Sequence, residues 1–407
     1  MITIIRNARP WGGALADVIM NDGAITAIAP AGPDPAPGGG TVVDGRGRIL
    51  LPSFCDVHVH LDSSRIGLPF RPHTGSPGVW NMMQNDRRNW RDAEVSMTER
   101  TTTTLGRMIA NGTTRVRSYA QVDVDCGLER LDAVIAAREA HADRADVLIM
   151  AFPQAGLLRE SGTPAVLEDA VRAGADLVGG IDPCALDRDP VRHLDIVFGL
   201  AERYGVGVDI HLHEPDQLAL FSTELIMERT RALDLRGRVT ISHGYGLAAL
   251  PEPTLRELLE TFRELDVAWA TVAPARTPLP LVTLAEHGIR VGLGEDGQRD
   301  YWSPYGNCDM LDRTWQLAFT NGFRPDRLIE HCAAVATVGG RSVIDPSVRL
   351  ASVDDRPGVA VGDPADLVLV PGDTVTAAIM DRGPDRTVLH RGVVVADHGE
   401  LIPDGAA

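Results

Sequence analysis

The chain has 407 residues and a formal net charge of −17, with 44% hydrophobic and 23% charged residues. This composition is typical of a folded protein with a sizeable core, and the length suits one barrel with additions. The acidic charge argues against nucleic acid and anionic membranes as partners and favours a small neutral or cationic substrate. No apolar run approaches the roughly 18 residues of a membrane span.

The cysteines and the N-terminus predict a cytoplasmic location. Five cysteines are scattered without a CxxC pair, which favours free thiols over a disulfide framework. The first residues lack the basic region, apolar core and cleavage site of a signal peptide. The sequence contains no lysine, so all 39 basic residues are arginine, and neither a Schiff base nor a carbamylated lysine is possible.

Both ends of the chain have the pattern of short β-strands separated by turns rich in Gly and Pro. Two all-β ends around a long middle predict one small β-sandwich domain, built jointly from residues 1–50 and 350–407. The expected strands are 2–6, 16–20, 24–28, 41–44, 366–370, 375–380, 387–390 and 393–396.

Residues 51–349 alternate short apolar segments with amphipathic helical stretches, which is the pattern of a parallel βα repeat. Eight such units predict an α/β fold, a (β/α)8 TIM barrel with its chemistry at the C-terminal ends of the strands. The expected strands are 53–60, 113–122, 146–152, 175–181, 207–213, 238–243, 267–272 and 289–294. Two long connections, 62–91 and 297–309, are expected to shape or cover a substrate pocket.

Metal-ligand residue types end four of these strands. His58 and His60 end the first strand, and the alternation of side chains places both imidazoles on one face. His211, His243 and Asp296 end later strands at the same rim. A single histidine at a strand end is more often a packing residue, but four strands bringing such residues to one rim predict a shared metal site.

The order of these residues resembles the amidohydrolase superfamily and, within it, the cytosine deaminase group. Parts of the chain also resemble the isopropylammelide hydrolases of s-triazine breakdown. The segments that carry the first resemblance are 54–62, 152–156, 211–214, 242–243, 294–296 and 300–302, and those that carry the second are 176–183 and 299–310.

The resemblance implies one divalent metal ion, Zn or Fe(II), which lowers the pKa of its bound water toward about 7. The absence of lysine agrees with the mononuclear branch of the superfamily, because the binuclear branch generally needs a carbamylated lysine. The implied metal ligands are His58, His60, His211 and Asp296.

The resemblance also implies roles for residues around the metal. Asp296 accepts a proton, Glu214 carries a proton to a ring nitrogen, and His243 orients the attacking water. Gln154 reads the edge of a planar ring, since an amide offers both a donor and an acceptor. Trp302 packs beside the ring, although a capping glutamine and a core tryptophan are fair competing interpretations of these two residues.

Some positions depart from the cytosine deaminase pattern. Gly297 stands where that group carries a second acidic residue, and His213 stands where a small or acidic residue is usual. Arg65, Arg71 and His73 in the first long connection are candidates for contact with a carbonyl-rich or anionic substrate. These departures leave the ring open between a pyrimidine, a triazine and another aminated heterocycle.

The sequence therefore predicts an aminohydrolase that deaminates a small N-heterocycle, such as a cytosine-like pyrimidine, and releases ammonia. One alternative keeps the site but removes an N-alkylamine from an s-triazine or opens a cyclic amide. A second alternative, an inactive binding or scaffold member of the fold, is disfavoured because every ligand position is filled. Analogy with relatives also suggests a homo-oligomer.

Overall fold

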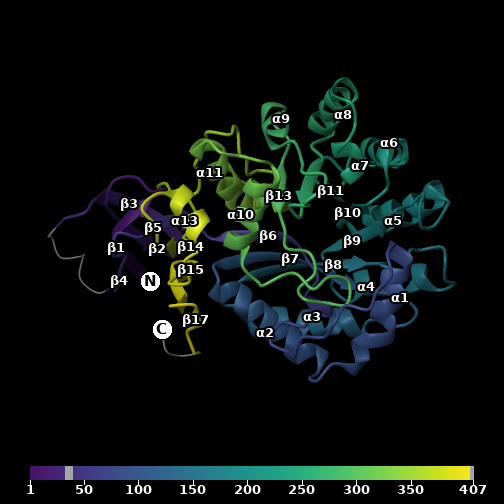
Figure 1. The fold of residues 1–407 in the computed structure, drawn as a ribbon, viewed down its shortest axis with the longest axis horizontal. Helices are drawn as coiled ribbons and strands as arrows, with labels where there is room; N and C mark the ends of the chain where they lie inside the picture. Colours follow the sequence, from purple (N-terminus) through teal and green to yellow (C-terminus); the bar gives the residue numbers. More distant parts are fainter. Residues whose placement is uncertain (33–39, 404–407) are drawn as a thin grey trace.

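Eight parallel strands form a barrel in the computed structural model, which describes residues 1–32 and 40–403 (Figure 1). The strands pair in chain order, and the barrel closes where Val59 pairs with Asp296 in a parallel bridge. They are β6 (Phe54–Val59), β7 (Thr113–Gln121), β8 (Asp146–Phe152), β9 (Leu177–Ile181), β10 (Gly207–Leu212), β11 (Val239–His243), β12 (Ala268–Thr271) and β13 (Val291–Leu293). The predicted barrel is confirmed.

Helices follow the barrel strands and cover their outer side (Figure 1). In α8, for example, five buried apolar residues recur at three- and four-residue spacing, which makes one continuous apolar stripe against the barrel. The barrel helices are α1 (Val79–Asn89), α2 (Met97–Ala110), α3 (Glu129–Ala140), α4 (Thr163–Arg172), α5 (Pro190–Tyr204), α6 (Asp216–Ala232), α7 (Tyr245–Ala248), α8 (Glu252–Leu265), α9 (Leu281–Glu286), α10 (Met310–Thr320), α11 (Asp326–Ala334) and α12 (Gly340–Ile344). Within the described residues, no helix has the length and apolar character that crossing a membrane requires.

A second sheet combines both ends of the chain, beside the barrel (Figure 1). The central strand β5 pairs in parallel with β1 and antiparallel with β14, so it joins the two ends into one unit. Its strands are β1 (Ile2–Pro10), β2 (Ala16–Asn21), β3 (Ala24–Pro30), β4 (Thr41–Asp44), β5 (Ile49–Pro52), β14 (Leu367–Val370), β15 (Thr387–His390), β16 (Val393–Asp397) and β17 (Glu400–Leu401). This sheet confirms the predicted small β domain, while its exact boundaries stay a prediction.

The strand predicted at residues 375–380 is wrong, because this segment forms helix α13 (Val375–Asp381). The Thr374 side chain accepts a hydrogen bond from the Ala377 amide and caps the helix. Val375, Ala378 and Ile379 are buried at helical spacing. An N-cap and a three-to-four-residue period thus outweigh the β-branched residues that suggested a strand.

Candidate active site

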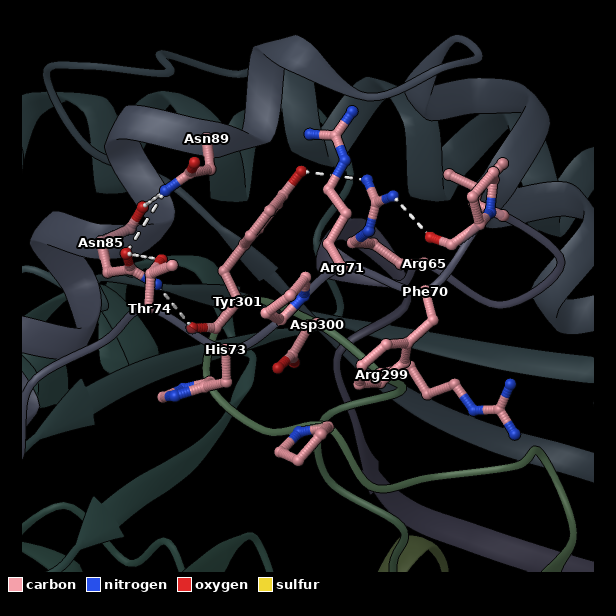
Figure 2. A pocket seen from close by; sticks show the side chains of 14 residues that line it. Arg65, Phe70, Arg71, His73, Thr74, Asn85, Asn89, Arg299, Asp300 and Tyr301 are labelled. Atoms are coloured by element: carbon pink, nitrogen blue, oxygen red, sulfur yellow. Dashed lines mark hydrogen bonds between the residues drawn. The ribbon is translucent and has the colours of Figure 1, made fainter.

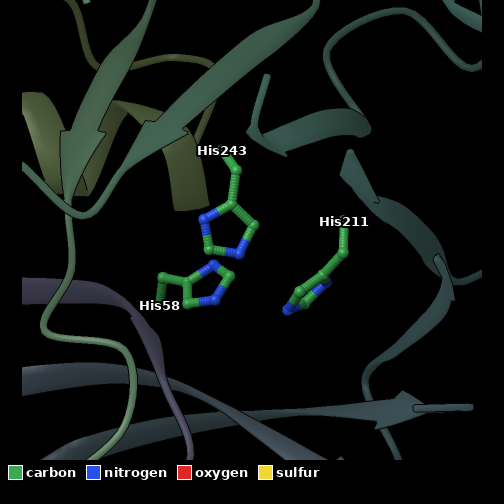
Figure 3. Close-up of side chains that lie close together, drawn as sticks. All are labelled: His58, His211 and His243. Carbon is green, nitrogen blue, oxygen red and sulfur yellow. The ribbon is translucent and has the colours of Figure 1, made fainter. Parts of the chain in front are cut away.

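Four histidines and an aspartate meet at the C-terminal end of the barrel. Ring nitrogens of His58, His211 and His243 lie within 4.8 Å of one another, and these three side chains are drawn in Figure 3. A second group within the same distance joins His58 to His60 and Asp296. The Oδ1 atom of Asp296 lies 3.6 Å from Nε2 of His58 and 3.4 Å from Nε2 of His60. The structure therefore brings together the residues that the sequence singled out.

Several of these ring nitrogens are buried without a partner among the described residues. His58 is 0% exposed and His211 is 2% exposed. Nε2 of His58 and both ring nitrogens of His211 make no hydrogen bond. Burying unpaired polar atoms costs free energy, so such atoms call for a ligand. Imidazole nitrogens with one carboxylate are a donor set that fits a divalent ion such as Zn or Fe(II).

A chain of hydrogen bonds fixes the tautomer of His58. Ser242 Oγ donates to Asp209 Oδ1 over 2.7 Å and lies 3.1 Å from Nδ1 of His58. The single Ser242 proton goes to the Asp209 carboxylate. In the contact between Ser242 and His58, Nδ1 of His58 must therefore be the donor. The Tyr119 hydroxyl and the Arg117 guanidinium also donate to Asp209. Nε2 of His58 is then unprotonated and free to bind a metal.

The electrostatics of the cluster favour the protonation states that metal ligands need. Burial and the neighbouring imidazoles hold the pKa of His211 and of His243 well below the ordinary value. Burial alone would raise the pKa of Asp296, but His58 and His60 outweigh it and hold that pKa well below the usual range. Burial would lower the pKa of His60, but Asp296 outweighs it and raises that pKa, so His60 differs from the other imidazoles and loses its proton less readily. A neutral imidazole and an ionised carboxylate can bind a cation without first losing a proton.

Two of these residues sit in a backbone conformation that is unusual for side chains other than glycine. His243 and Asp296 both have φ of 66°. The Trp269 indole donates to the His243 carbonyl over 3.0 Å. The Asp296 amide donates to the His58 carbonyl over 2.7 Å, across the closing seam of the barrel. These two hydrogen bonds hold the unusual backbone conformation in place, and backbone strain of this kind is typical of functional sites.

A small cavity of about 90 Å³ opens above the cluster. Its wall includes the predicted Gln154 and Trp302, together with Phe152 and Ile181. The Phe152 ring stacks on the His211 ring, with centroids 4.0 Å apart and planes 21° apart. The rest of the wall is mostly polar, with four histidines, two aspartates and two serines, so the cavity suits a small, flat ligand that also carries hydrogen-bonding groups.

Glu214 takes a different position from the one its predicted role suggests. Among the described residues the cavity wall contains His213, not Glu214. The Glu214 carboxylate accepts hydrogen bonds from the amides of Cys184 and Ala185, at 2.7 and 2.8 Å, and from the Ser222 hydroxyl. Burial raises its pKa. Its role in proton transfer stays a prediction.

Two titratable side chains of the cavity wall have no role that the sequence predicts. His213 stands out in the sequence only as a departure from the deaminase pattern, and it is held by Asp182, whose Oδ2 lies 2.9 Å from Nδ1. Asp300 belongs to one of the matching segments, and it lies between the cavity and the long connection 62–91. The signal that could have found Asp300 is its position four residues after Asp296, in a loop expected to shape the pocket.

Arg65, Arg71 and His73 line a separate outer cavity of about 270 Å³, which Figure 2 shows. Arg65 and Arg71 both pair with the Glu94 carboxylate, each at 2.8 Å. His73 Nε2 lies 3.0 Å from the Trp302 carbonyl. Arg65 and His73 contact the loop that carries Trp302, whereas Arg71 donates hydrogen bonds only to Glu94 and the Asp92 carbonyl among the described residues. The wall of the cavity above the histidines and Asp296 includes none of the three.

A barrel with histidines at the ends of β6, β10 and β11 and an aspartate after β13 is the arrangement expected of an amidohydrolase. The chain belongs to the amidohydrolase family, whose model matches residues 85–396. The family defines it as a hydrolase of carbon–nitrogen bonds.

Several known proteins are similar over nearly the whole chain. The structure of N-isopropylammelide isopropylaminohydrolase from Burkholderia multivorans has a TM-score of 0.90 and 36% identity, covering 99% of this chain and 100% of that one. The structure of 5-methylcytosine deaminase from Klebsiella pneumoniae, liganded with phosphonocytosine, has a TM-score of 0.79 and 25% identity, covering 97% and 98%. N-isopropylammelide isopropyl amidohydrolase of Pseudomonas sp. strain ADP is 26% identical over 362 residues, 87% of each chain.

Proposed function

We propose that this protein uses one divalent metal ion to hydrolyse an exocyclic carbon–nitrogen bond of a small aminated N-heterocycle. The observation that carries the proposal is the set of buried ring nitrogens beside Asp296 that make no hydrogen bond among the described residues, beneath a small cavity whose wall includes Phe152 and Trp302. His58, His60, His211 and Asp296 would hold the ion. When bound, a divalent ion makes hydroxide available at neutral pH and polarises the bond under attack.

The residues around the ion divide the proton chemistry between them. The ionised Asp296 carboxylate accepts the proton that the attacking water loses. His243 is a neutral imidazole whose Nδ1 lies 2.9 Å from the Tyr245 hydroxyl, so its Nε2 remains to orient that water. Glu214, with its pKa raised by burial, is the proposed carrier of a proton to the ring nitrogen beside the reacting carbon.

The cavity wall supports a planar ring as the substrate. Phe152 and Trp302 offer aromatic surface on the wall, and such surface packs well against a flat heterocycle. The Gln154 side chain, only 7% exposed, offers one donor and one acceptor group to a lactam or amidine edge. An exocyclic amine on such a ring leaves after hydroxide adds to the ring carbon and the amine gains a proton.

The identity of the leaving amine separates two candidate reactions. Deamination releases ammonia, and the glutamate at position 214 supports it because that residue matches the ring-protonating acid of cytosine deaminases. The 36% identity with an N-isopropylammelide isopropylaminohydrolase supports the second candidate, release of an alkylamine from an oxygenated s-triazine. Both reactions use the same metal site and the same ring pocket.

A panel assay tests the proposal. The metal-loaded protein is incubated with cytosine, 5-methylcytosine, pterin, ammelide and N-isopropylammelide, and ammonia and isopropylamine are each quantified. We expect one of these amines to be released at a rate proportional to enzyme concentration, and the His211→Ala variant to be inactive. If metal-loaded protein releases neither amine from any compound, the proposed function is wrong.

A further inference from the structure

Gly297 has no side chain and leaves a gap beside its neighbour Asp296, one of the proposed metal ligands. The carboxyl group of Asp300 fills this gap. A Cβ atom on Gly297 would lie 2.9 Å from Cγ and 3.0 Å from Oδ1 of Asp300, and closer still to Oδ2. The backbone of Gly297 is outside the left-handed region, so its conformation does not require glycine. A side chain at position 297 would instead force the Asp300 carboxyl to shift.

The hydrogen bonds of Asp300 leave one acceptor position open. Its Oδ1 accepts from the amides of Trp302 and Ser303, both at 2.8 Å. Among the described residues, its Oδ2 accepts only from the Ser63 hydroxyl, at 3.1 Å, and the single proton of that hydroxyl is shared with the His60 carbonyl at 3.3 Å. A carboxylate oxygen can accept two hydrogen bonds, so Oδ2 has capacity for another donor.

Asp300 lies where the open acceptor position of its Oδ2 atom can meet a substrate. Asp300 is 8% exposed and lines both the cavity above the cluster and the outer cavity, where Figure 2 shows it below Tyr301. The turn that its Oδ1 stabilises also fixes the backbone of Trp302. One short turn therefore presents both an aromatic surface and a carboxylate to the same small cavity.

We propose that Asp300 binds a ring N–H of the substrate through the open acceptor position of its Oδ2 atom. This proposal rests on the proposed function, because it assigns a substrate contact within the same site. It selects heterocycles with a protonated ring nitrogen, such as lactams, over rings that offer only acceptors. An N–H bond to a carboxylate is charge-assisted, and losing it is expected to weaken binding by about 10- to 100-fold.

The Asp300→Asn variant tests the contact without removing the turn. Its amide oxygen can still accept from Trp302 and Ser303, while the second oxygen becomes an NH2 donor. Calorimetric titration of zinc-loaded protein with cytosine and with ammelide is expected to show affinity about 10- to 100-fold lower than wild type. Asp354→Asn, at a side chain 67% exposed, is the matched control and should bind as wild type does.

A second experiment moves the carboxyl group from position 300 to position 297. Asp300→Ser keeps a side-chain oxygen for the turn but vacates the space beside Gly297. Gly297→Asp alone is expected to lose binding, since two carboxyl groups then compete for one space. Gly297→Asp combined with Asp300→Ser is expected to bind cytosine or ammelide at least fivefold more tightly than Asp300→Ser alone, with unchanged zinc content.

The outcomes separate this proposal from the function on which it rests. If wild type binds or hydrolyses a probe and Asp300→Asn binds it equally well, the role of Asp300 is wrong and the proposed function stands. The role of Asp300 is also wrong if the double variant binds no more tightly than Asp300→Ser. If zinc-loaded wild type neither binds nor hydrolyses any heterocycle of the panel, the proposed function fails and the role of Asp300 fails with it.

Discussion

The Ser242→Ala substitution should weaken metal binding without unfolding the protein. Ser242 connects Nδ1 of His58 to the Asp209 carboxylate, at 3.1 and 2.7 Å. Without the hydroxyl, the buried Nδ1–H of His58 has no acceptor there. In the metal-free variant the proton can move from Nδ1 to Nε2 of His58, which lies 3.6 Å from Asp296, so that no buried N–H is left without an acceptor. A metal ion needs that same Nε2 unprotonated, so binding must reverse the change.

The size of the effect follows from this competition. Loss of such an outer partner of a metal-bound histidine typically costs 10- to 100-fold in metal affinity, equal to about 1.4–2.7 kcal/mol. Asp209 keeps its contacts with Tyr119 and Arg117, so the fold around it should persist. The metal-free variant is therefore expected to unfold at nearly the wild-type temperature, whereas the zinc-loaded variant gains less stability from zinc than wild type does.

Competition titration with a chromophoric zinc chelator measures this difference directly. Ser118→Ala is the matched control, since Ser118 is also a buried barrel-strand serine but its hydroxyl makes no hydrogen bond to any residue that the structure describes. The control should retain wild-type affinity. If Ser242→Ala binds zinc as tightly as wild type, the hydrogen-bond chain does not set the tautomer of His58 and the reasoning is refuted.

Three further predictions concern the metal, a proton carrier and a buried histidine. Chelation should abolish amine release and lower the unfolding temperature, and re-addition of Zn or Fe(II) should restore both; activity that survives complete metal removal contradicts the account. Glu214→Gln should lower kcat by about 100- to 10,000-fold with metal content unchanged, and a wild-type kcat would remove Glu214 from the mechanism. Burial lowers the pKa of His331 from 6.5 to about 4, so its contribution to stability is complete above pH 6.5 and falls as the pH drops toward 4. Urea unfolding should therefore show His331→Gln losing about 3 kcal/mol less than wild type between pH 7 and pH 4, and equal losses would contradict the shift.

The sequence predicted the barrel and the grouping of histidines with an aspartate at its rim, because both follow from local patterns. Strand β8, for example, contains the unbroken apolar segment 147–152, so it stands out in the sequence. The alternation of side chains along β6 directs His58 and His60 to one face. The common orientation of parallel strands then places His211, His243 and Asp296 at the same rim.

The rest of the site depends on contacts that no local pattern encodes. The donors to Glu214 include the amides of Cys184 and Ala185, about thirty residues earlier in the chain. The carboxyl of Asp300 reaches the space beside Gly297 only because a turn folds the loop back on itself. Helix α1 lies inside the long connection 62–91, where no helix is predicted from the sequence. Each of these features depends on tertiary packing, and not on the spacing of apolar residues along the sequence.

The most direct test of the central claim is a parallel measurement of metal content and amine release. Protein purified without chelator is analysed by mass spectrometry of its metals and then assayed for ammonia and alkylamine from the heterocycle panel. The account predicts one divalent ion per chain in wild type, with amine release in proportion to metal occupancy, and neither in His211→Ala. A wild-type chain that holds no ion when Zn or Fe(II) is supplied, or whose amine release is independent of metal occupancy, would contradict it.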